Sequence, residues 1–139
     1  MRDKAFRWLA GHQAVIICLL WGIWDAATAV AYLDGAPQQL QTAERLLHMP
    51  IWVVWATAAT MLIIGALVPA GKGRIWMDAA IWLRGIGLTI SAALLGVWSL
   101  EFFFAESERG WVSGKNYLLL TFVALHYGWM VSRYSVREG

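Results

Sequence analysis

Charge is scarce in this sequence. Only 14% of its 139 residues are Asp, Glu, Lys or Arg, whereas roughly a quarter of the residues in a soluble domain are charged. The net charge of +2 is too small to indicate a nucleic acid as partner, and the chain has no arginine-rich arm and no glycine-rich phosphate loop. The composition therefore argues against an ordinary soluble domain and against a nucleic-acid-binding protein.

Residues suited to catalysis or metal binding are also few. The one cysteine, Cys18, cannot form an internal disulfide, and it lies in an apolar run, where a thiol is usually inert. The three histidines, His12, His48 and His126, fall at different predicted depths, which argues against a haem or zinc site. No nucleophile, base and orienting acid form a recognisable arrangement. We therefore expect no metal, no cofactor and no enzymatic activity.

Long apolar runs are what the sequence does contain. Hydrophobic residues make up 60% of the chain, and ten Trp suit the headgroup level of a bilayer. A membrane-spanning helix needs about 20 mostly apolar residues, and four spans are predicted at about 14–33, 50–68, 81–104 and 116–131. A more polar stretch at about 37–48 is expected to form a short interfacial helix. The sequence thus predicts an all-α integral membrane protein whose single domain, 1–139, is a bundle of four transmembrane helices.

The first apolar run could in principle be a cleaved signal peptide. Its length exceeds the 7 to 15 residues of a signal-peptide core, and Asp25 interrupts it where such a core is most apolar. We therefore interpret it as a retained membrane anchor.

Positive charges predict the orientation of the bundle. Three basic groups would fall on one side of the membrane, namely Arg2, Lys4 and Arg7 before the first span, Lys72 and Arg74 between the second and third, and Arg133 and Arg137 after the fourth. Cytoplasmic loops carry an excess of Lys and Arg. The predicted location is the cell (inner) membrane with both termini in the cytoplasm. The stretch from the far end of the third span to Lys115 is net acidic, with Glu101, Glu106 and Glu108 against Arg109 and Lys115.

Small residues at helical spacing predict the faces on which the helices pack. Helices in lipid associate where small side chains let their backbones approach. The predicted packing residues are Gly22 and Ala26 in the first span, Gly85, Thr89, Ala92, Gly96 and Ser99 in the third, and Gly128 in the fourth; Ala56 and Thr60 form a shorter stripe in the second. Because every span has such a face, we expect self-association or docking to another membrane protein.

Asp25 stands close to the middle of the first span, where an ionisable group costs at least about 2.5 to 3.5 kcal/mol. It shares the small stripe of its helix, so it should face protein. Its expected partner is Arg84, or else His126 or a hydroxyl such as that of Thr57, Thr60 or Ser91. Two interpretations stay open. Asp25 is either the titrating group of a proton or cation relay, or a neutral or hydrogen-bonded residue that fixes helix register or oligomer contacts.

For the other polar and aromatic residues at membrane depth, structural roles are expected. Arg84 is expected to reach the headgroups, and Glu101 to lie at the outer interface. His126 falls on a face away from Gly128 and would meet a neighbouring subunit or snorkel. Trp21 and Trp24 flank Asp25 and are expected to fill a helix interface, although they could also wall a cation site.

In architecture, the whole chain resembles the small phage holin-like membrane proteins, through its short loops, its several spans and a basic tail with Arg133 and Arg137. It departs from them in having four spans and a tail less dense in Lys and Arg. The resemblance implies self-association in the inner membrane and a role in permeability. Two alternatives are a small proton- or cation-coupled transporter or channel that uses Asp25, and a non-catalytic membrane subunit that binds a partner protein.

Overall fold

The computed structural model describes residues 2–68, 73–104 and 110–134, and the side chains within 12–38, 40–68, 73–104 and 110–131. The elements are α1 Arg2–Ala31, the 3-10 turn η1 Gln38–Leu40, α2 Gln41–Leu47, α3 Ile51–Leu67, α4 Arg74–Phe104 and α5 Gly110–Tyr134. The described ranges contain no strand. The all-α fold class predicted from the sequence is therefore confirmed.

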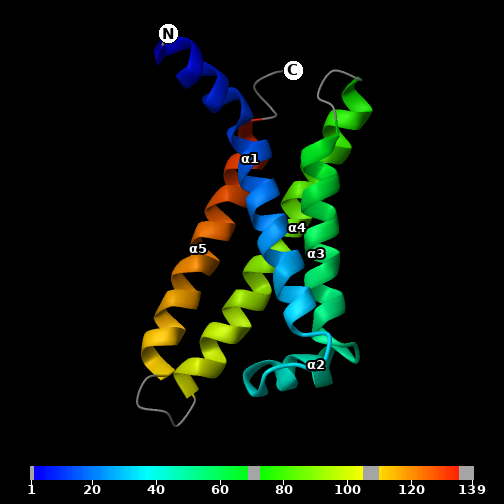
Figure 1. The fold of residues 1–139 in the computed structure, drawn as a ribbon, viewed down its shortest axis with the longest axis vertical. Coiled ribbons are helices and arrows are strands. Elements are labelled where there is room, and N and C mark those ends of the chain that lie inside the picture. The colour runs from blue at the N-terminus through cyan, green and yellow to red at the C-terminus, as the bar shows by residue number, and fades with distance from the viewer. Residues whose placement is uncertain (1, 69–72, 105–109, 135–139) are drawn as a thin grey trace.

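The four long helices form an up-and-down bundle (Figure 1). Consecutive long helices are neighbours: α1 packs on α3, α3 on α4, and α4 on α5, whereas α1 has few contacts with α4 or α5. The start of α1 and the ends of α3 and α5 lie at one end of the bundle, and α2 lies at the other (Figure 1). The ends of the helices thus have the sidedness that the four-span prediction requires, while the membrane side of each end remains a prediction.

By length and composition, two helices within the described residues can cross a membrane, not the four that we predicted. These two are α1 over His12–Ala31 and α4; a third candidate arises only if α2 and α3, which meet at a bend of 80°, count as one span. α3 has 17 residues, or about 26 Å, against a hydrocarbon core of about 30 Å. In α5, the polar residues Lys115 and Asn116 near the start shorten the apolar stretch.

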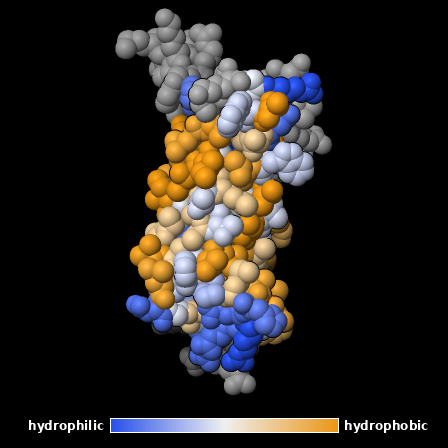
Figure 2. All heavy atoms as spheres, turned by 90° about the vertical axis from the view of Figure 1, so that its right-hand side faces the viewer, coloured by the Kyte–Doolittle hydropathy of each residue, from blue (hydrophilic) through white to orange (hydrophobic). Residues whose placement is uncertain are grey.

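The surface of the bundle agrees with a membrane environment. Large apolar side chains are exposed along the long helices, among them Leu20, Ile64, Trp82, Leu119 and Phe122. Figure 2 shows hydrophobic residues across the middle of one face, with strongly hydrophilic residues gathered at its lower end. A soluble protein would hide such a surface, whereas lipid covers it without cost.

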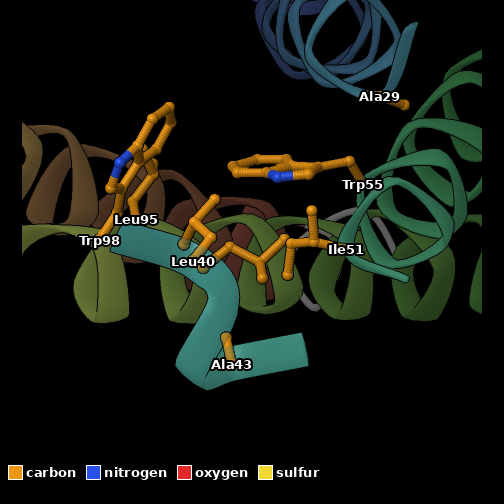
Figure 3. Close-up of a cluster of buried hydrophobic side chains, with 8 residues drawn as sticks. Ala29, Leu40, Ala43, Ile51, Trp55, Leu95 and Trp98 are labelled. Carbon is orange, nitrogen blue, oxygen red and sulfur yellow. The ribbon is translucent and has the colours of Figure 1, made fainter. Parts of the chain in front are cut away.

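A short helix is present at about the predicted position, as η1 followed by α2, and it packs on protein as well as facing outward. Leu40 is fully buried and Ala43 nearly so, while Leu46 and Leu47 are exposed. Figure 3 shows Leu40 beside Ile51, below the Trp55 indole. The Glu44 carboxylate accepts a hydrogen bond of 2.8 Å from the Ile51 amide, which satisfies a donor at the start of α3. This segment therefore closes one end of the bundle.

Several residues used in the orientation and loop predictions lie outside the described side chains. They are Arg2, Lys4, Arg7, Lys72, Glu106, Glu108, Arg109, Arg133 and Arg137.

Candidate functional site

Asp25 lies on the face of α1 that packs into the bundle. This face contains Cys18, Gly22, Asp25 and Ala29, at steps of four, three and four residues, and all four are buried. A methyl group added at Gly22 would lie 2.8 Å from Ile63 Cγ1, so the α1 backbone meets α3 closely here. The close approach leaves Asp25 fully buried, facing protein as the sequence predicts.

The partner of Asp25 is Ser91 of α4. Ser91 Oγ lies 2.6 Å from Asp25 Oδ2 and 3.0 Å from the Gly87 carbonyl oxygen, and the serine is also fully buried. The second carboxyl oxygen, Asp25 Oδ1, is buried without a hydrogen-bond partner. A Cβ at Gly87 would lie only 2.7 Å from Leu62 Cγ. The carboxyl group is thus enclosed where α1, α3 and α4 meet.

Arg84, the expected partner of Asp25, is engaged elsewhere. Its Nε donates a 2.8 Å hydrogen bond to the carbonyl oxygen of Gly65 near the end of α3. The last carbonyls of a helix lack intrahelical donors, and the helix dipole makes that end favourable for a cation. Arg84 therefore joins α4 to the end of α3, in the half of the bundle where α3 ends.

The other two candidate residues are not part of this site. His126 is exposed on α5, with its ring centroid 6.1 Å from that of Trp129. Glu101 is half-buried near the end of α4. The four polar residues predicted from the sequence do not form one cluster. Among them, only Asp25 is fully buried in the bundle.

An aromatic cluster that the sequence analysis did not identify joins all four long helices. The ring centroids of Trp24 and Trp55 are 5.5 Å apart, and those of Trp55 and Trp98 are 6.5 Å apart. Trp98 stacks on Tyr117 of α5 at 4.4 Å. Trp24 was expected to fill a helix interface, and the ten Trp of the sequence were the available signal. The spacing along each helix could not show which of them meet.

The small residues predicted to mark packing faces take different positions. Ala92 and Ser99 are buried, and Ser99 Oγ donates a 2.7 Å hydrogen bond to the Gly114 carbonyl oxygen of α5. A Cβ at Gly96 or Gly128 would meet the partner helix at an ordinary 3.7 Å. Ala26, next to Asp25, is half-buried. In the second span, Ala56 is half-buried and Thr60 is exposed, and α3 packs instead through residues including Trp55, Ala59, Leu62 and Gly65.

A groove of about 480 Å³ runs between α4 and α5 on the outside of the bundle. Its lining includes Gly85, Thr89, Ala124 and Gly128 together with the larger Trp82 and Trp129. A Cβ at Gly85 would have no atom within 4 Å, so the chain's own helices leave this glycine open. Two residues of the predicted small stripe, Gly85 and Thr89, thus face outward into the groove.

Among the described residues, no group of three or more His, Cys, Asp or Glu could hold a metal ion. The chemistry available at the enclosed site is therefore that of a carboxyl group and a hydroxyl group, which can exchange or share a proton. Comparison with protein-family models, curated proteins and solved structures found no match for this chain.

Proposed function

We propose that this protein is a four-span protein of the inner membrane, with both termini in the cytoplasm, that self-associates and in its assembled form alters membrane permeability. Although α3 and α5 do not qualify as spans by themselves, each packs along a helix that does, α3 along both α1 and α4 and α5 along α4. Neighbouring helices can supply the contacts that a short or partly polar span lacks in lipid. The basic residue pattern supports this orientation.

The groove between α4 and α5 is the observation that carries the proposal. Helix association in lipid depends on small residues that let backbones approach. Gly85 and Thr89 offer such a surface, and no described side chain fills the space above Gly85. A helix from a second copy could lie between Trp82 and Trp129 and bring its backbone close to Gly85.

The filled interior of one bundle supports an effect through assembly. Among the described residues, the buried side chains are apolar apart from Asp25, Ser91 and Ser99, and α2 with η1 closes one end. A water-filled path through a single copy would need a polar lining. A permeability pathway is therefore expected between copies and not through one of them.

The test replaces Gly85 with Leu, which projects a side chain into the groove from a position where an added Cβ meets no atom within 4 Å. The full-length protein in liposomes is expected to release an entrapped dye and to form cross-linked oligomers, and Gly85→Leu should reduce both at least tenfold. Ala27→Leu adds bulk at an exposed position on α1 and is the matched control, with both signals unchanged. Release and cross-linking that survive Gly85→Leu would refute self-association through this groove.

Ion-coupled transport through Asp25 is a second candidate, because Asp25 Oδ1 is buried without a partner inside the bundle. This function predicts pH-dependent ion flux into liposomes that Asp25→Asn abolishes and Gly85→Leu leaves intact. Absence of both flux and dye release, with co-purification of one specific membrane protein, would instead favour a non-catalytic subunit.

A further inference from the structure

Ser91 has two hydrogen-bond acceptors within reach but only one proton to donate. Both contacts can be hydrogen bonds with a proton each only if Asp25 is protonated. A hydroxyl group has a single proton to donate, yet Ser91 Oγ lies within hydrogen-bond distance of two acceptors, Asp25 Oδ2 at 2.6 Å and the Gly87 carbonyl at 3.0 Å. If Asp25 is a carboxylate, Ser91 can satisfy only one of them. If Asp25 is a neutral acid, it can donate to Ser91 Oγ while Ser91 donates to Gly87. A separation of 2.6 Å fits a hydroxyl–carboxyl hydrogen bond in either direction.

Among the described side chains, no cation forms a hydrogen bond with the Asp25 carboxyl group. Arg84, two turns before Ser91 on α4, donates its Nε proton to Gly65. Cys18 lies two turns before Asp25 on α1, and Tyr127 of α5 packs on the cluster around Cys18. The buried face of α3 near the site offers Ala58, Ala59 and Leu62, none of which titrates. Within the described side chains, only Ser91 forms a hydrogen bond with Asp25.

We infer that Asp25 is a proton-binding site, at which the neutral acid donates a hydrogen bond to Ser91 Oγ and Ser91 donates a hydrogen bond to the Gly87 carbonyl oxygen. The ligand is a single proton, which needs no cavity. Burying an isolated carboxylate is far more costly than burying a hydrogen-bonded neutral acid. With the proton bound, the Asp25 carboxyl donates to Ser91 Oγ, and the Ser91 hydroxyl donates to the Gly87 carbonyl oxygen.

The bound proton joins two helices that otherwise meet little. α1 packs mainly on α3 and has few contacts with α4. The Asp25–Ser91 hydrogen bond is a buried polar link across that junction. Loss of the proton would leave a buried charge, and two acceptors would then compete for the one serine proton. This inference concerns a single copy and does not depend on self-association through the groove.

Infrared spectroscopy of the full-length protein in lipid nanodiscs at neutral pH tests the inference. A protonated carboxylic acid has a C=O stretching band that a carboxylate lacks. We expect this band in the wild type, its loss in Asp25→Asn, and its retention in Asp34→Asn, which removes an exposed carboxyl group. Absence of the band from the wild type, or its persistence in a folded Asp25→Asn variant, would overturn the assignment.

Ser91→Ala provides a second measurement that does not require Asp25→Asn to fold. It removes the hydroxyl oxygen that accepts the proton of the acid, so the C=O band should remain but shift in frequency. Thr89→Ala, an exposed hydroxyl on the same helix that bonds to Gly85, is the control and should leave the band in place. An unshifted band in Ser91→Ala would show that the protonated carboxyl group does not donate a hydrogen bond to Ser91. It would refute the proposed hydrogen bonds from Asp25 to Ser91 and from Ser91 to Gly87.

Discussion

Gly85 and Gly87 are two residues apart on α4, and we predict opposite responses to the same substitution. A Cβ at Gly87 would lie 2.7 Å from Leu62 Cγ, 3.0 Å from Leu62 Cδ2 and 3.2 Å from the Ala58 carbonyl oxygen. Real Cβ contacts are almost never as short as 2.7 Å and seldom as short as 3.2 Å. Neither the Ala58 backbone oxygen nor the branch carbon of the fully buried Leu62 can move aside easily. α3 and α4 must therefore separate slightly to accept Gly87→Ala. At Gly85, nothing lies within 4 Å, and Gly85→Ala fits without movement.

The paired design isolates the steric cost. Replacing Gly with Ala inside a helix is worth about 1 kcal/mol in helix propensity, and this gain applies to both positions. Overpacking a filled interface costs about 1 to 3 kcal/mol, and it applies only to Gly87. The free energy of unfolding of Gly87→Ala should thus lie about 1 to 3 kcal/mol below that of Gly85→Ala.

Unfolding in mixed micelles with increasing SDS, followed by helical circular dichroism, measures this difference. Both variants are compared with the wild type at protein concentrations where all three are monomeric, so that the groove at Gly85 has no effect on the result. Equal stability of the two variants would contradict the close approach of α3 and α4 on which the enclosure of Asp25 depends.

Two further predictions concern the closed end of the bundle. Glu44→Ala removes the acceptor of the Ile51 amide and should lower the free energy of unfolding by about 0.5 to 2 kcal/mol, while Glu44→Gln keeps an acceptor oxygen and should recover most of it; equal losses in both variants would contradict a capping role. Trp98→Ala removes the stack on Tyr117 and the contact with Trp55 and should cost about 3 to 5 kcal/mol, with Trp98→Phe milder. The same SDS titration measures both, and a neutral Trp98→Ala would refute a structural role for the aromatic cluster.

The direction in which Asp25 points could be predicted from the sequence. Cys18, Gly22 and Asp25 repeat at helical spacing, and a costly carboxyl group in a span must turn toward protein. Its partner could be predicted only as one of several alternatives, among them Ser91. Arg84 is the opposite charge that a pairing argument selects, but the axial position of α4 against α3 brings Arg84 to Gly65 and Ser91 to Asp25. The axial position of α4 depends on how the side chains of three helices pack together. It therefore cannot be predicted from the sequence of any one span.

The packing faces, too, could be predicted from the sequence only in part. Small residues at steps of three and four placed Gly85 and Thr89 on a candidate contact face of α4. Among the described glycines of α4, however, the one whose added Cβ would lie closest to another helix is Gly87, about 200° around the helix from Gly85. Periodicity identifies which residues share a face. Which neighbour covers that face depends on the order of the helices in space.

By itself, the sequence determined an all-helical, lipid-compatible chain, because long apolar runs with little charge can satisfy their backbone hydrogen bonds in a bilayer only within helices or a closed barrel. It also determined that Asp25 would be enclosed. Only the tertiary structure decided that Ser91 is its partner, that α2 and η1 close one end, and that Gly85 is left open while Gly87 is covered. These outcomes depend on contacts between residues far apart in the chain, for which local spacing contains no information.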